Sequence, residues 1–192
     1  MKYVMIFHAN LNYAYLNPDK YEFVIRNSYE LTFDTMAENF PNTKYVFEAS
    51  GYTIEQMALL TPDVLEKLKK AIANGTCEFM GSPYAHPMLP NFPQEDGTWA
   101  IKFSNDIFKK YLGITPKSFW NPECGWRSYV PQQVIDNGFR NLIGDFEAYS
   151  RSRLKNGQPV RPEIFEKEYS DDPAFYSFDF RSTKLKAMKP TA

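Results

Sequence analysis

The chain has 192 residues, of which 43% are hydrophobic and 17% aromatic, so it carries enough apolar mass for one sizeable core or two small ones. Its 22 Lys and Arg against 23 Asp and Glu leave a net charge of −1, which excludes a bulk electrostatic attraction to nucleic acid or to an anionic membrane. No run approaches the roughly 18 apolar residues of a membrane span, and the N-terminal stretch lacks a signal-peptide pattern. We therefore expect a soluble, cytoplasmic protein. Two cysteines, Cys77 and Cys124, are too few for a disulfide framework and lack the paired spacing of a zinc motif.

Short apolar runs alternate along the chain with segments of helical spacing, and this pattern predicts an α/β fold. The runs predicted as strands are residues 3–7, 44–51, 77–81, 118–120 and 141–144. The segments predicted as helices are residues 18–40, 53–74 with a restart at Thr61-Pro62-Asp63, 99–112 and 130–137. Strand-helix alternation implies parallel strands joined by right-handed crossovers. Because a closed eight-fold barrel needs about 200 to 250 residues, the pattern predicts an incomplete barrel, an open sheet or a truncated chain.

The pattern decays after Tyr149, where only residues 175–180 read as one more strand and residues 184–192 show no periodicity. We therefore divide the chain into a barrel portion, residues 1–148, and an irregular C-terminal segment of the same domain, residues 149–192. A barrel that stops near its fifth or sixth strand leaves an unpaired sheet edge. The C-terminal segment is expected to fold back over that edge, unless a homo-oligomer or a separate C-terminal subunit covers it.

The strongest local signal is the segment 118–126, in which Glu123 follows a strand and a proline turn and lies between Trp120 and Trp126. A glutamate near an aromatic wall can serve as nucleophile or proton donor, while indole faces stack against sugar rings. The segment therefore indicates a carbohydrate site. Its alternative interpretation is a solvated loop glutamate beside two core tryptophans.

Two further segments place polar side chains where strands end. The third strand carries Glu78 and its exit holds Tyr84 and His86 in a loop stiffened by prolines, and the first strand ends at His8 and Asn10. Parallel α/β folds gather functional residues at the carboxyl ends of strands. We therefore expect one rim formed by the strand exits, which lie at His8, Glu48, Ser82, Glu123 and Asp145. The alternative for each histidine is a structural role in its loop.

The order of these segments resembles glycoside hydrolase family 57. The resemblance rests on His8-Ala9-Asn10 after the first strand, on Glu78 and Tyr84-Ala85-His86-Pro87 around the third, and on Phe119-Trp120-Asn121-Pro122-Glu123 after the fourth, within residues 1–147. The family contains α-amylases, 4-α-glucanotransferases, amylopullulanases and branching enzymes. It folds as an incomplete, TIM-like (β/α)7 barrel, needs no metal or other cofactor, and retains anomeric configuration.

The resemblance implies roles for individual residues. Glu123 matches the catalytic glutamate nucleophile of the family. Eight residues are implied to bind an α-glucan or oligosaccharide substrate, namely His8, Asn10, Glu78, Tyr84, His86, Trp120, Trp126 and Asp145. The first family motif usually reads His-Gln-Pro, so Ala9 and Asn10 depart from it.

The family's general acid is an aspartate on a later strand, followed by a helical domain, and both are expected to lie beyond residue 192. Retaining hydrolysis needs two carboxyl groups about 5 to 5.5 Å apart. The chain is therefore expected to be a retaining α-glucan hydrolase or glucanotransferase, or its N-terminal part. One alternative is a catalytically silent carbohydrate-binding module with the same rim. Another is a metal-dependent polysaccharide deacetylase, which the two histidines 78 positions apart disfavour because that chemistry needs a closely spaced histidine pair.

Overall fold

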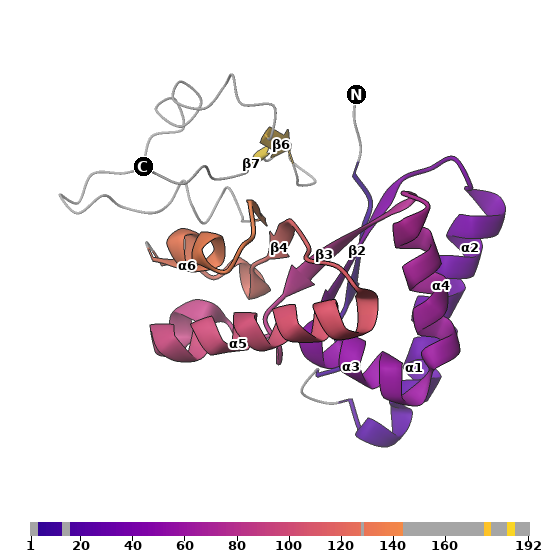
Figure 1. The fold of residues 1–192 in the computed structure, drawn as a ribbon, viewed down its shortest axis with the longest axis horizontal. Helices are drawn as coiled ribbons and strands as arrows, with labels where there is room; N and C mark the ends of the chain where they lie inside the picture. The colour runs from indigo at the N-terminus through magenta and orange to yellow at the C-terminus, as the bar shows by residue number, and fades with distance from the viewer. Residues whose placement is uncertain (1–3, 13–15, 128, 144–174, 178–183, 187–192) are drawn as a thin grey trace.

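A five-stranded parallel sheet runs through the centre of the molecule (Figure 1). The computed structural model describes residues 4–12, 16–127, 129–143, 175–177 and 184–186. Its strands are β1 (Ile6–Ala9), β2 (Tyr45–Ser50), β3 (Cys77–Ser82), β4 (Ser118–Trp120) and β5 (Asn141–Ile143), and they pair in chain order. The predicted α/β class and the presence of all five strands are confirmed, but β1 extends to Ala9, so that His8, expected in the exit loop, lies within the strand. Within the described ranges β1 and β5 are the two edges of this sheet.

Helices connect the strands at the predicted places. The first connection holds η1 (Pro18–Lys20), α1 (Tyr21–Val24), the π-helical turn η2 (Ile25–Glu30) and α2 (Leu31–Asn39). The later connections hold α3 (Gly51–Leu60), α4 (Pro62–Ala73), η3 (Leu89–Asn91), α5 (Gln94–Ile107), the π-helical turn η4 (Phe108–Leu112), η5 (Pro122–Cys124) and α6 (Val130–Asp136). Helix α5 begins at Gln94 instead of residue 99. Its first turn carries Glu95 and Asp96, whose negative charges suit a helix N-terminus. Because these residues are not apolar, the apolar spacing of the sequence did not include them.

Alternation along β2 separates an apolar face from a polar one. Tyr45, Phe47 and Ala49 belong to the main core, where the Phe47 ring lies 5.8 Å from the Tyr29 ring and 4.8 Å from the Phe33 ring. Glu48 points to the opposite face, since successive side chains in a strand alternate. All six residues of β2 are nevertheless buried, so both of its faces are covered.

A second apolar cluster lies around β4 and β5. Phe119 and Leu142 pack with Val130 and Val134 of α6, together with Leu89 and Ile101. The Phe119 and Phe139 rings meet edge to face at 4.9 Å. This cluster fixes the end of the sheet from which the loop carrying Glu123 departs.

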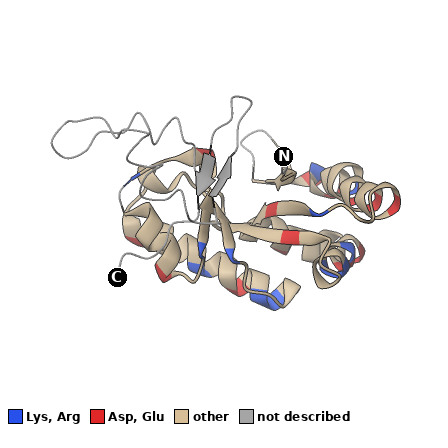
Figure 2. Cartoon of the chain, turned by 90° about the horizontal axis from the view of Figure 1, so that it is seen from above, with Lys and Arg blue, Asp and Glu red and all other residues tan. Residues whose placement is uncertain are grey.

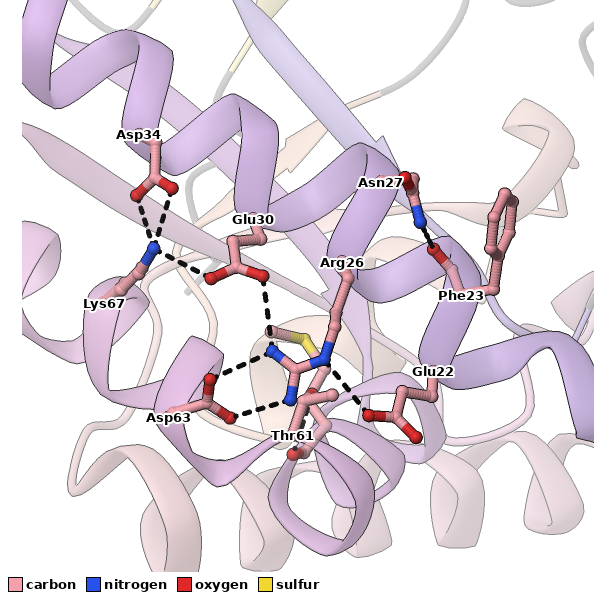
Figure 3. A network of polar contacts seen from close by, with 10 residues as sticks. Glu22, Phe23, Arg26, Asn27, Glu30, Asp34, Thr61, Asp63 and Lys67 are labelled. Atoms are coloured by element: carbon pink, nitrogen blue, oxygen red, sulfur yellow. Dashed lines mark hydrogen bonds and ion pairs between the residues drawn. The ribbon is translucent and has the colours of Figure 1, made fainter.

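Ion pairs join the helices of the first connection to α4 (Figure 3). The Arg26 guanidinium donates to Asp63 at 3.0 Å, and it also pairs with Glu22 and Glu30. Lys67 of α4 reaches Glu30 at 2.8 Å. Figure 2 shows acidic and basic residues scattered over the helices, with acidic positions on the strands as well.

Two short strands lie near the C-terminus. Strands β6 (Phe175–Ser177) and β7 (Lys184–Lys186) pair antiparallel, and β7 runs close to β5. A strand at residues 175–180 was expected, whereas β7 falls in a segment without a predicted element. In the part of the chain that the structure describes, no helix is long and apolar enough to cross a membrane.

Candidate active site

The candidate site begins with a pair of residues on adjacent strands. His8 of β1 and Glu48 of β2 are register partners, and the Nδ1 atom of His8 shares a hydrogen bond with Oε2 of Glu48. The Glu48 side chain is fully buried, whereas the His8 side chain is 42% exposed. The pair therefore links a carboxylate inside the sheet to an imidazole at the surface.

His86 approaches the same carboxylate from the loop after β3. Its backbone N–H donates to the Pro83 carbonyl at 3.0 Å, which closes a tight turn. Its Nε2 atom lies 3.9 Å from Oε1 of Glu48, and its ring meets the His8 ring edge to face at 5.0 Å. The His86 side chain is only 5% exposed. Glu48 thus lies between the two imidazoles of the chain.

The loop after β4 completes the group. The Trp120 ring lies 5.5 Å from the His8 ring, and Glu123 follows in the turn η5. The Asn121 side chain donates to the Gly125 carbonyl at 2.5 Å and closes that turn. The negative charge of Glu123 contributes to the electrostatic environment of His8, so the two side chains belong to one site.

Burial and charge divide the two imidazoles. Burial lowers the pKa of His8, but the hydrogen bond to Glu48 and the charges of Glu48 and Glu123 outweigh it, so the net pKa is raised. Burial, with the neighbouring charge of His8, lowers the pKa of His86 to about 4. His86 is therefore neutral at neutral pH, whereas the environment of His8 favours its protonated form.

Backbone strain is concentrated in the same two loops. Among the described residues, the only non-glycine positions with positive φ are His86 at 55°, Glu123 at 53° and Cys124 at 50°. The left-handed conformation costs an L-residue about 1–2 kcal/mol, and such strain is concentrated at functional sites. These loops also pack tightly, because a Cβ added to Gly125 would lie 2.8 Å from Met88. The fold thus holds His86 and Glu123 in place at a cost.

The remaining predicted site residues fall elsewhere. Asn10 accepts a hydrogen bond from the Asn12 N–H at 3.0 Å, and Asn12 in turn donates to the Ala85 carbonyl, so Asn10 shapes the loop beside His86. Tyr84 turns toward α3, where its hydroxyl donates to Glu55 at 2.6 Å. Trp126 packs against the second apolar cluster. Asp145 lies outside the described residues.

Glu78 does not reach the rim on which it was expected. It lies two residues before Met80, the β3 residue that pairs with Glu48, so it lies nearer the amino end of the sheet. Its carboxylate accepts a hydrogen bond from Ser118 at 2.7 Å. It lines a cavity together with Val4, Lys44 and Lys117. Glu78 is the second residue of β3, and a strand rises about 3.3 Å per residue. Its side chain therefore lies well away from Ser82, at the carboxyl end of the strand where the rim begins.

Glu48 is the member of the group that sequence reasoning named only as a strand exit and not as a site residue. The available signal was a charged residue inside an otherwise apolar strand, Tyr45-Val46-Phe47-Glu48-Ala49-Ser50. Buried carboxylates are rare unless they are paired. The signal indicates that a partner exists, but it does not identify His8 and His86.

Comparison with known protein families gives a match over nearly the whole chain. The model of the family described as "Glycosyl hydrolase family 57" matches residues 2–186. The chain belongs to glycosyl hydrolase family 57. The resemblance noted in the sequence is confirmed.

Two named relatives are similar to the chain in sequence. The chain is 27% identical over 128 residues to "Alpha-amylase 1" of Dictyoglomus thermophilum, which covers 65% of this chain and 19% of that protein. It is 26% identical over 140 residues to the 4-alpha-glucanotransferase of Thermococcus litoralis, which covers 73% of this chain and 20% of that protein. The chain therefore spans about a fifth of the length of these curated relatives.

A solved structure shows the same fold. The crystal structure of the 4-alpha-glucanotransferase from Thermococcus litoralis superposes with a TM-score of 0.67 at 22% identity, over 95% of this chain and 26% of that one. This family member therefore has the sheet and helix arrangement found in about a quarter of a longer family protein.

Proposed function

We propose that this family 57 chain acts on α-glucans as part of a retaining glycoside hydrolase or glucanotransferase, with Glu123 as the nucleophile. The observation that carries the proposal is the strained turn after Trp120, in which the backbone of Glu123 adopts the left-handed conformation. The hydrogen bond from the Asn121 side chain to the Gly125 carbonyl closes this turn. A nucleophile must be held in place before substrate binds, and a strained, closed turn does so. The printed names of the relatives, an alpha-amylase and a 4-alpha-glucanotransferase, support the same substrate class.

The proposed reaction has two steps. A carboxylate oxygen of Glu123 bonds to the anomeric carbon while the glycosidic C–O bond breaks, and the leaving oxygen takes a proton from a carboxylic acid. Water or a sugar hydroxyl then attacks the anomeric carbon, the bond between that carbon and the Glu123 oxygen breaks, and the attacking oxygen gives its proton to the carboxylate left by the acid, so the configuration is retained. We assign the proton donor to no described residue.

His8 and Trp120 are proposed to hold the sugar ring next to Glu123. Trp120 offers an indole face for stacking, and the half-exposed imidazole of His8 offers a hydrogen-bond donor to hydroxyl groups. Glu48 orients His8 through its Nδ1 atom, which leaves the Nε2 atom to meet the substrate. In this arrangement Glu48 is a positioning residue.

The decisive experiment compares Glu123→Gln with Glu38→Gln, which makes the same chemical change on the exposed surface of α2. Turnover of maltoheptaose and covalent labelling by a 5-fluoro-α-glucosyl fluoride are measured, the latter by mass spectrometry of peptides. We expect Glu123→Gln to lose turnover by roughly a thousandfold or more and to lose the label, whereas Glu38→Gln retains both.

Two other outcomes would contradict the assignment. A label on a different carboxylate would transfer the nucleophile role to that residue. A wild-type chain that binds maltoheptaose but is neither labelled nor active would instead support a catalytically silent carbohydrate-binding module.

A further inference from the structure

Three side chains of the site form a set of metal ligands that the proposed glycosidase chemistry does not require. The Nδ1 atom of His8, a carboxylate oxygen of Glu48 and the Nε2 atom of His86 all lie within 4.8 Å of one another. They come from β1, β2 and the loop after β3, so the sheet itself brings them together. Two imidazole nitrogens and one carboxylate oxygen are a donor set that suits zinc and related divalent ions.

Two buried atoms in this set face each other without a hydrogen-bond partner. They are Oε1 of Glu48 and Nε2 of His86, and 3.9 Å separates them. Buried polar atoms in folded proteins nearly always have a partner, so two orphaned atoms at one point require an explanation. A cation bound between them would satisfy both at once.

The tautomer of His86 favours metal binding. Its ring forms a hydrogen bond with its own backbone, and since Nε2 has no partner, the nitrogen involved is Nδ1. A proton held on Nδ1 leaves a lone pair on Nε2 of the neutral ring. That lone pair points into the group where Glu48 presents its free oxygen.

Strain at His86 supports the same conclusion. Its φ of 55° is unusual for a residue with a side chain, and it is maintained by the turn to Pro83 and by the prolines on either side. The His86 side chain is only 5% exposed, so hydrogen bonds to solvent do not explain why its ring faces Glu48. The backbone is strained to aim an imidazole at a buried carboxylate.

We propose that His8, Glu48 and His86 bind one divalent transition-metal ion of the zinc type. The metal replaces the proton shared by Nδ1 of His8 and Oε2 of Glu48, so binding releases a proton. Ligands of one tetrahedral zinc ion lie about 3.4 Å apart, so the group closes by small side-chain rotations. Three protein ligands leave a fourth position for water or for a sugar hydroxyl. This site is independent of the assignment of Glu123 as nucleophile.

The chain itself offers a clean test, because His8 and His86 are its only histidines. Untagged protein stripped with a chelator is titrated with ZnCl2 in a calorimeter, and ¹⁵N-histidine spectra are recorded at each step. We expect one equivalent of Zn²⁺ to bind and to shift Nδ1 of His8 and Nε2 of His86 together, while the other nitrogen of each ring keeps its proton.

Variants identify the ligands. We expect Zn²⁺ binding to weaken by about 100-fold or more in each of the variants His8→Gln, His86→Gln and Glu48→Gln. Losing a residue that only hydrogen-bonds to a metal ligand already costs about 10- to 100-fold, so losing a ligand should cost at least as much. Glu38→Gln and Cys124→Ser, the latter removing the half-buried thiol near the site, should leave the affinity unchanged. His8→Gln changes a half-exposed side chain, so it tests the site even if the two buried substitutions impair folding.

The proposal is overturned if no 1:1 binding is seen at 100 µM Zn²⁺, if only one histidine responds, or if His8→Gln binds as tightly as the parent. None of these results bears on Glu123. Conversely, a zinc-binding protein whose Glu123→Gln variant remains active would contradict the proposed nucleophile and leave the metal site intact.

Discussion

The side chain of Asn121 donates a hydrogen bond to the backbone carbonyl of Gly125, and it does so across the turn that carries Glu123. Asn121 itself is buried, and the turn holds two successive non-glycine residues at positive φ. One amide group thus closes a strained loop whose conformation would otherwise relax. The side chain of Asn121 is therefore expected to help hold the proposed nucleophile in position.

Asn121→Ala is therefore expected to lower turnover of maltoheptaose by about 10- to 100-fold, since small displacements of a reacting group cost that much. The matched control is Asn27→Ala, because the Asn27 side chain also donates to a backbone carbonyl, that of Phe23, but on an exposed helix. Initial rates and the melting temperature are measured for both. Equal rates for the two variants would mean that the Asn121 bond does not position Glu123.

The two cysteines should differ sharply in reactivity. Burial raises the pKa of the Cys77 thiol to about 12, whereas Cys124 is half-buried beside Glu123. Thiolate is the reactive form, so at pH 8 we expect Cys77 in the folded protein to react with Ellman's reagent at least ~100-fold more slowly than Cys124. The rate at Cys77 should rise with pH up to about 12, because the thiolate fraction grows until that pKa is passed.

A Cys124→Ser variant assigns the fast phase, and unfolding in guanidinium makes both thiols reactive. Saturating maltoheptaose should slow the Cys124 reaction if the sugar occupies the site next to Glu123. An unchanged rate would place the glucan elsewhere.

Phe47 should be among the residues most important for stability. It is 1% exposed, and its ring packs edge to face against the rings of Tyr29 and Phe33. Phe47→Ala is expected to cost about 3–5 kcal/mol in the free energy of unfolding, because the cavity cannot collapse against a sheet. Phe23→Ala, at a ring that is 65% exposed, should change it by less than about 0.5 kcal/mol. Urea unfolding followed by far-UV circular dichroism measures both, and similar values would contradict the placement of the core.

The ion pairs of Figure 3 should contribute in a salt-dependent way. Arg26→Gln removes the contacts to Asp63, Glu22 and Glu30, all on the helical surface. We expect a small fall in melting temperature at low ionic strength, because exposed pairs are weak. The difference should vanish near 1 M NaCl, where the screening length is about 3 Å. A loss that persists in high salt would indicate that Arg26 acts through packing instead.

Local patterns determined the elements of this fold. The apolar runs around Phe47 and Phe79 and the helical spacing of residues 18–40 are visible in the sequence, and each became a strand or a helix. The π-helical turn Ile25–Glu30 was not predicted, because the apolar pattern of residues 18–40 in the sequence is that of an ordinary α-helix. The chemical types at the strand exits, His8, His86 and Glu123, were also readable, because parallel strands end at one side of a sheet.

Tertiary structure alone decided which of those side chains meet. Glu48 and His8 are 40 residues apart, and they became partners because β1 and β2 pair in one particular register. Tyr84 shares a loop with His86 yet faces α3, and Glu78 shares a strand with Ser82 yet lies toward its other end. Periodicity specifies the face of an element, but the register between strands and the path of a strained loop are set by packing across the whole chain. The pairing of a buried carboxylate with two imidazoles is therefore a property of the fold and could not be read from the sequence.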